Sequence, residues 1–188
     1  TGDAALISLA GPANKQGRII ADNICGLDSR YQGSQGSSII KAFDVTAALT
    51  GLNERSAREM GLDVETVILS PMSHAGYYPG GMVMTMKVVF EKGTYRLLGA
   101  QIVGYEGVDK RIDVLATAIR AGIKATDLKN LDLAYAPPYS SAKDPVNMAG
   151  FLIDNIANGL LEQWHLEDVD RLPRDGSVTL LDTRTVGE

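Results

Sequence analysis

Cysteine and histidine are scarce in this chain of 188 residues, which narrows the chemistry available to it. Cys25 is the only cysteine, so no disulfide can form within the chain, and no Cys/His cluster indicates zinc or another metal. His74 and His165 lie far apart in sequence, and neither has a serine or cysteine nucleophile nearby. The sequence therefore offers little support for a catalytic triad. A single cysteine, which we expect to pack near a helix end, favours a reduced, cytoplasmic setting.

Clustered positive charge and long apolar runs are also missing. The net charge is -5, whereas a nucleic-acid-binding surface needs clustered lysine and arginine. No apolar run approaches the roughly 18 residues of a membrane helix, and nothing resembles a signal peptide. We therefore expect neither a nucleic acid nor a membrane among the partners of this protein.

What is present is the composition of an ordinary globular protein, with 45% hydrophobic and 22% charged residues. The length allows one sizeable domain with a real core, or one domain plus parts of others. The chain has no initiator methionine and stops just after a predicted strand at residues 178–182. We therefore expect it to be a piece of a longer protein.

Apolar periodicity predicts an α+β domain in the middle of the chain. Two strands rich in Val, Ile and Met flank residues 92–94, which indicates an antiparallel hairpin. The expected architecture is a largely antiparallel sheet covered by helices on one side, with a domain junction near Gly159. Helices are expected at 13–24, 54–60, 109–121, 126–131 and from 145 onward, and strands at 39–49, 64–69, 82–91, 95–105 and 178–182.

Two short segments place tyrosines beside proline and glycine, outside any helix or strand interior. They are HAGYYPGG at residues 74–81 and YAPPYSSAKDP at residues 135–145. Tyrosine hydroxyls on kinked backbone can offer hydrogen bonds to a ligand. Ordinary aromatic-rich turns would explain the pattern equally well, and for His74 a structural role in its turn is favoured.

Other candidate sites allow two interpretations each. The helix start at residues 11–14 could offer free N–H groups to an electron-rich ligand, although most helix starts bind only water. Residues 33–38 lack the lysine and context of a phosphate loop and are expected to be a solvated loop. Lys143 and Asp144 could form a surface pair, or Lys143 could contact a phosphate or carboxylate.

Together these segments resemble the C-terminal part of coenzyme A-disulfide reductases. That group belongs to the flavin-dependent pyridine nucleotide-disulfide oxidoreductases, with NADH oxidases, NADH peroxidases and persulfide reductases. The segments that carry the resemblance are LAGPANKQG at residues 9–17, GVDKRID at 107–113 and the two tyrosine segments. The resemblance implies three parts: the end of an FAD domain with a linker (1–36), a dimerisation domain (37–159), and a linker with the start of a rhodanese-like domain (160–188).

The resemblance also implies roles for particular residues. Leu9, Ala10 and Gly11 would contact the flavin. In the implied homodimer, Tyr77 and Tyr135 would reach the partner subunit's active site, with Tyr135 near the flavin and Tyr77 near the sulfur chemistry. A phenol there can act as a proton source.

Substrate contacts follow from the same resemblance. Asn14 and Lys143 would contact coenzyme A, and the lysine suits a phosphate as a point charge. The family's nucleophilic cysteine and its dinucleotide fingerprints belong to a region not present here, and Cys25 does not match that cysteine. The parent protein is expected to use FAD and NAD(P)H, and this fragment alone to be inactive.

The tail resembles the opening of a rhodanese domain. Trp164, His165 and the sequence VTLLDTRTVGE at residues 178–188 carry this likeness, which includes an Asp-x-Arg at Asp182 and Arg184. The module would break off before its persulfide-forming cysteine. A fused rhodanese module favours coenzyme A disulfide, persulfide or polysulfide over oxygen as the substrate of the reductase. The alternatives are an NADH oxidase, NADH peroxidase or persulfide reductase of the same family, or a purely structural dimerisation module.

Overall fold

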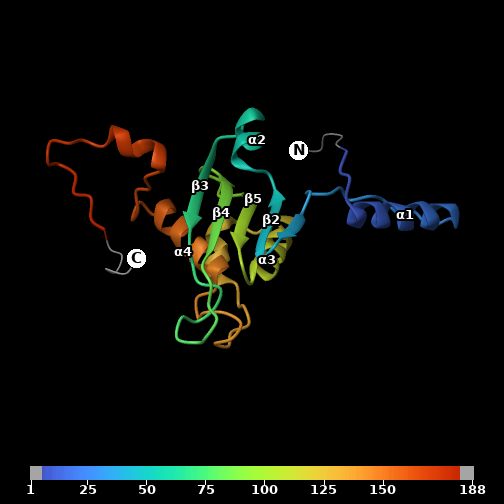
Figure 1. Ribbon diagram of the computed structural model, residues 1–188. Coiled ribbons are helices and arrows are strands. Elements are labelled where there is room, and N and C mark those ends of the chain that lie inside the picture. Colours follow the sequence, from blue (N-terminus) through green and yellow to red (C-terminus); the bar gives the residue numbers. More distant parts are fainter. Residues whose placement is uncertain (1–5, 183–188) are drawn as a thin grey trace.

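A five-stranded antiparallel sheet forms the centre of the computed structural model, which describes residues 6–182 (Figure 1). The strand order is β1-β2-β5-β4-β3, and every pair of neighbours is antiparallel. The strands are β1 (Ser38–Ala42), β2 (Val45–Gly51), β3 (Val64–Leu69), β4 (Met84–Glu91) and β5 (Leu97–Gly104). The expected α+β class and antiparallel sheet are confirmed.

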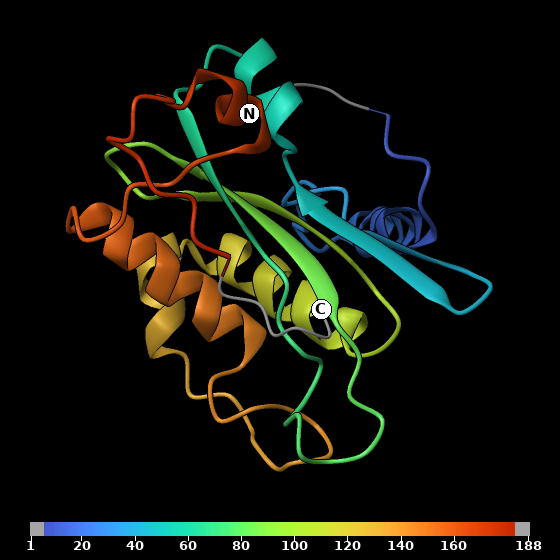
Figure 2. The ribbon, with the colours of Figure 1, turned by 60° about the vertical axis from the view of Figure 1, so that its left-hand side comes forward.

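Helices cover mainly one face of this sheet (Figure 2). The helices α3 (Val108–Ala121) and α4 (Pro145–Ala157), with the 3-10 helix η1 (Ala125–Asn130), enclose the main core. The short α2 (Glu54–Glu59) closes a smaller apolar cluster with β3, β4 and β5.

Two further helices lie outside this layered body. The helix α1 (Ala10–Ile24) has no buried residue and projects to one side of the sheet. The 3-10 helix η2 (Leu166–Arg171) follows α4 on the other side.

The structure corrects two strand predictions. The single strand expected at 39–49 is a hairpin, in which Phe43 turns the chain with a φ of 54° and Ala42 pairs with Val45. Apolar alternation indicates extended backbone on both sides of such a turn, and no glycine or proline marks the reversal. The strand expected at 178–182 does not form in the described part of the chain, where Leu180 and Leu181 are 74% and 79% exposed.

Close packing of α4 against η1 depends on a glycine. A Cβ atom on Gly150 would meet the backbone of Leu128 and Lys129, neither of which can rotate away. By contrast, a Cβ atom on Gly17 in the exposed helix α1 would meet nothing within 4 Å. The face of α4 that packs against η1 therefore requires glycine at position 150.

Substitution of Gly150 should destabilise the domain despite the better helix propensity of alanine. Alanine gains about 1 kcal/mol over glycine inside a helix, but overpacking a tight contact costs about 1–3 kcal/mol. Gly150→Ala should therefore lower the urea midpoint measured by circular dichroism. Gly17→Ala, the matched control, should leave the midpoint unchanged or raised, and an equal fall in both would contradict this explanation.

One ion pair is buried at the end of the sheet where α3 and α4 begin. Arg111 Nη2 lies 2.9 Å from Asp144 Oδ2, and the side chains are only 1% and 3% exposed. Asp144 also caps α4, because its carboxylate accepts the N–H of Val146 at 3.0 Å. Burial alone would raise the pKa of Asp144, but the Val146 N–H, the Arg111 guanidinium and the Ser140 hydroxyl hold that pKa below its ordinary value of 3.8.

Loss of either partner should destabilise the fold strongly, because the other charge is left buried. Arg111→Met or Asp144→Asn should cost about 3 kcal/mol of unfolding free energy in urea titrations. A lowered folded pKa stabilises the fold at pH above the unfolded value, and this contribution is lost as pH falls through the folded pKa. Asp144→Asn should therefore reduce the acid sensitivity of unfolding. Arg55→Met, which breaks the exposed Arg55–Glu59 pair, should cost under about 1 kcal/mol.

Candidate functional site

The two tyrosine-bearing loops lie side by side at one end of the sheet (Figures 1 and 2). The first, residues 70–83, joins β3 to β4, and the second, residues 131–144, joins η1 to α4. A backbone hydrogen bond from the N–H of Ala75 to the carbonyl of Ser140, at 3.1 Å, links them directly. Segments whose tyrosines, Tyr77 and Tyr135, are 58 residues apart in sequence thus form one surface.

The hydroxyl groups of Tyr77 and Tyr135 meet on this surface. Their oxygen atoms are 3.1 Å apart, and the residues are 76% and 48% exposed. The hydrogen bond with Tyr77, helped by slight burial, raises the pKa of Tyr135 above its ordinary value of 10.0. Tyr135 is therefore a neutral phenol at physiological pH. One hydroxyl of the pair donates its proton to the hydrogen bond between them. The accepting hydroxyl can therefore still donate its own proton to a third group.

His74 supports the first loop from inside. Its side chain is buried, its Nδ1–H donates to the carbonyl of Ala75 at 3.1 Å, and its ring meets that of Tyr78 edge to face at 5.6 Å. These contacts fit the structural role that the sequence favours for this residue.

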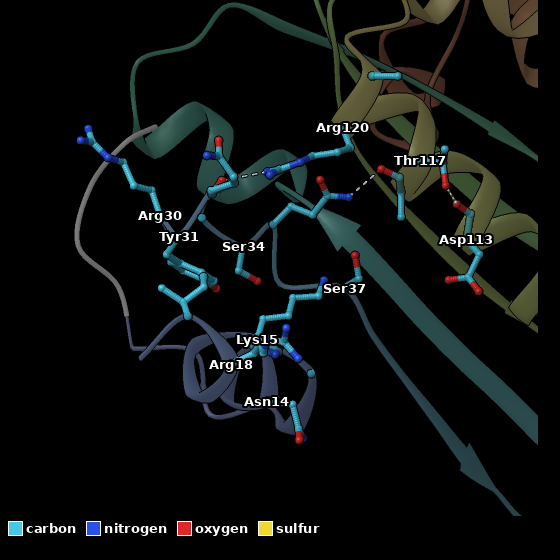
Figure 3. A pocket seen from close by; sticks show the side chains of 18 residues that line it. Asn14, Lys15, Arg18, Arg30, Tyr31, Ser34, Ser37, Asp113, Thr117 and Arg120 are labelled. Carbon is cyan, nitrogen blue, oxygen red and sulfur yellow. Dashed lines mark hydrogen bonds between the residues drawn. The ribbon is translucent and has the colours of Figure 1, made fainter. Parts of the chain in front are cut away.

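A second candidate region lies beside α1 (Figure 3), and neither Tyr77 nor Tyr135 is among the residues that line it. A groove of about 1140 Å³ runs between α1, residues 30–37 and α3. Four cationic side chains and the carboxylate of Asp113 line it, and Gly11 and Asn14 lie along its α1 side. The four cationic residues are Lys15, Arg18, Arg30 and Arg120.

The remaining predicted site residues are spread over the surface. Leu9, Ala10 and Gly11 form the start of α1, where no side chain caps the helix, and Asn14 Nδ2 donates to the carbonyl of Ala10 at 2.9 Å. The ammonium group of Lys143 lies 5.8 Å from the centre of the Phe151 ring. The structure thus brings Tyr77 and Tyr135 together but leaves the α1 residues elsewhere.

Cys25 does not pack as expected. It is exposed directly after α1, because that helix buries none of its residues in the described part of the chain. The expected Asp-x-Arg of the tail includes Arg184, which lies outside the described residues.

Sequence reasoning missed the residue that holds the two loops, Arg111. The signal was present: Arg111 interrupts the apolar stripe of α3 formed by Val108, Ile112 and Leu115. A charged residue on a core-facing stripe indicates a buried partner.

Two further observations concern metal binding and membrane spans. Among residues 6–182, no three His, Cys, Asp or Glu side chains are grouped so that they could hold a metal ion. None of the helices in that range is long and apolar enough to cross a membrane.

Comparison with known sequences gives one family and a consistent group of relatives. Residues 37–145 match the family described as pyridine nucleotide-disulphide oxidoreductase, dimerisation domain. Coenzyme A disulfide reductases of Staphylococcus epidermidis and Staphylococcus aureus are 38% and 36% identical over 148 residues, which is 78% of this chain. The chain spans about a third of the length of these curated relatives, 33%.

Solved structures agree with this result. The reduced CoADR-RHD of Bacillus anthracis is 48% identical, with a TM-score of 0.87 over 91% of this chain and 31% of that one. A NAD-dependent persulfide reductase from A. fulgidus is 46% identical, with a TM-score of 0.86 over 90% and 32%. The water-forming NADH oxidase of Lactobacillus brevis is 26% identical, with a TM-score of 0.79 over 85% and 36%. The chain belongs to the pyridine nucleotide-disulphide oxidoreductase family and contains its dimerisation domain.

Proposed function

We propose that this chain is the C-terminal part of a homodimeric flavoprotein that reduces coenzyme A disulfide, or a coenzyme A persulfide or polysulfide, with NAD(P)H. The observation that carries the proposal is the Tyr77–Tyr135 hydroxyl pair, at 3.1 Å on an exposed surface. The relatives named coenzyme A disulfide reductase and persulfide reductase support this substrate class.

The tyrosine pair would serve as a proton source for sulfur chemistry. Reduction of a disulfide releases a thiolate, which must be stabilised or protonated. Tyr135 is protonated at physiological pH, since its pKa does not lie below the ordinary tyrosine value of 10.0, so its hydroxyl can donate to that thiolate directly or through Tyr77. The nucleophilic cysteine would lie outside this chain, and the fragment alone would be inactive.

The start of α1 is the part of this chain that suits a flavin. A bound FAD would supply electron transfer from NAD(P)H to the sulfur centre. The N–H groups of Ala10 and Gly11 open a helix that has no side-chain cap, so they suit an electron-rich ring edge. They could hold one edge of the cofactor only. The N–H of Leu9 donates to the carbonyl of Ile7 at 2.9 Å, so Leu9 could contact the flavin only with its other atoms.

Sharing between two subunits would join the separate parts of the site. Within one chain, the tyrosine loops lie at the end of the sheet and α1 projects to one side (Figure 1). A second copy could bring its own α1 region to the tyrosine pair across a two-fold axis. Lys143 and Asn14 would then contact coenzyme A from opposite subunits.

Several substrates fit the same scaffold. The rhodanese-like tail and the name of the Bacillus anthracis relative favour sulfur substrates, whereas the Lactobacillus brevis relative is an oxidase that forms water. Fold alone does not choose among them.

Removal of both hydroxyls should separate catalysis from assembly. In the intact flavoprotein, Tyr77→Phe with Tyr135→Phe should lower turnover of coenzyme A disulfide by about 10- to 100-fold, as for loss of a general acid. The flavin absorbance and the dimer should be unchanged. Tyr95→Phe is the control, because Tyr95 stacks on Phe90 at the β4–β5 turn, and only its hydroxyl is lost.

Two outcomes would contradict the proposed role. Unchanged turnover in the double variant would remove the tyrosines from the chemistry. Dissociation of the dimer in sedimentation velocity would instead indicate that they are interface contacts in an association module.

The pKa of Tyr135 should report on its partner. Tyr77→Phe removes the hydrogen bond that raises this pKa, so the value should fall toward 10.0. Titration of ¹³C-labelled tyrosine by NMR would measure the change in this chain. Tyr105→Phe, at another exposed tyrosine, should leave the Tyr135 titration as it is. A Tyr135 titration that Tyr77→Phe does not alter would disprove the coupling.

A further inference from the structure

We propose that the first turn of α3 is a clamp that positions the Tyr77–Tyr135 pair, and that Arg111, Lys110 and Ser140 are its positioning residues. This inference rests on the proposed function for its effect on catalysis. Its geometric content, the placing of two hydroxyls, can be tested separately.

Arg111 binds both tyrosine loops at once. In the first loop it donates from Nη2 to the carbonyl of Ser73 at 2.9 Å. In the second loop the same Nη2 donates to Asp144 Oδ2 at 2.9 Å. Its two N–H protons are also shared with the carbonyl of Tyr139 and with Ser140 Oγ, which both lie at the longer distance of 3.3 Å. A single rigid guanidinium therefore joins the segments that carry the two tyrosines.

Each loop is closed close to the clamp. Ser73 and Met82 form two hydrogen bonds. The N–H of Ser73 donates to the carbonyl of Met82 at 2.8 Å, and the N–H of Met82 donates to Ser73 Oγ at 3.1 Å. This closes the loop whose exposed part carries Tyr77. In the second loop, Ser140 Oγ donates to Asp144 Oδ2 at 2.7 Å, so the serine lies between the loop and the ion pair.

Lys110 holds the other end of the second loop. Its Nζ donates to the carbonyl of Ala134 at 3.4 Å, directly before Tyr135, and lies 3.7 Å from Asp144 Oδ2. Two consecutive residues of α3 thus fix the second loop on both sides of Tyr135. Two largely exposed side chains stay at 3.1 Å from each other only if the backbone of both loops is fixed.

The clamp explains a buried charge that packing alone does not require. A well-packed apolar residue at position 111 could fill the same space without the cost of burying a guanidinium. It could not bind a carboxylate, a hydroxyl and two carbonyls on two different loops. The geometry points to selection for the position of the loops.

Ser140→Ala is the sharpest test, because it removes one contact of the clamp and leaves the Arg111–Asp144 pair in place. In the intact flavoprotein it should lower kcat about tenfold, since small displacements of a proton donor reduce rates strongly. KM should stay within about twofold, as for an interaction made only in the transition state. Lys110→Met should lower kcat in the same direction.

The controls are matched to these changes. Ser177→Ala removes a serine that likewise donates to a carboxylate, that of Asp175, on an exposed surface. Lys124→Met changes an exposed lysine beyond the C-terminal end of α3. Neither control should alter kcat.

A double-mutant cycle separates positioning from general stability. If the clamp acts through the hydroxyl pair, Ser140→Ala should have no further effect in the Tyr77→Phe, Tyr135→Phe background. An equal loss of kcat in both backgrounds would overturn the inference and indicate a merely structural role.

The pKa of Tyr135 tests the clamp without reference to enzyme activity, and so separates this inference from the proposed function. Ser140→Ala should lower the pKa of Tyr135 toward 10.0, because the Tyr77 contact is weakened. If the double tyrosine variant is fully active but this pKa still falls, the proposed function fails and the clamp stands. If Ser140→Ala and Lys110→Met both leave the pKa unchanged, the clamp is overturned.

Discussion

The buried Arg111–Asp144 ion pair is the interaction on which the loop end of this domain depends. Asp144 caps α4, Arg111 belongs to the first turn of α3, and both side chains are almost fully enclosed. A buried pair adds little to stability relative to an apolar substitute, but it is very costly to break. Here the pair fixes the positions of the groups around it, because a guanidinium has several N–H donors at fixed angles. Those donors fix the ends of two helices and two loops at one point.

The sheet and the loops are stabilised by different kinds of contact in this arrangement. The sheet and the helices on it bury a continuous apolar core, which makes a stable base. The tyrosine loops carry exposed side chains and depend on polar contacts for their shape. Functional groups on loops held by a rigid base are a common solution, because the base can stay constant while the loops change.

Membership of the oxidoreductase family and the geometry of the loops support the same proposal from different directions. The family match covers the sheet, the helix α3 and both loops, and ends at the first residue of α4. The proposed flavin chemistry would require residues that this chain, which spans about a third of the length of its curated relatives (33%), does not supply. The tyrosine pair is what this chain itself could add: a neutral proton donor presented on the surface. Two copies related by symmetry would explain why that donor and the α1 groove are separate within one chain.

The sequence by itself determined the local structure of this protein. Apolar periodicity predicted the helices α3 and α4 and the β4–β5 hairpin around Gly93, because burial imposes those periods on the chain. The short α2 was predicted from its capping residues, Asn53 and Gly61. It failed at Phe43 and at residues 178–182, where a turn without glycine or proline and a missing strand partner leave no mark on periodicity. Tyr77 and Tyr135 could be suspected from their neighbours. Only the tertiary structure decided that they touch, because Arg111 joins loops that no local pattern connects.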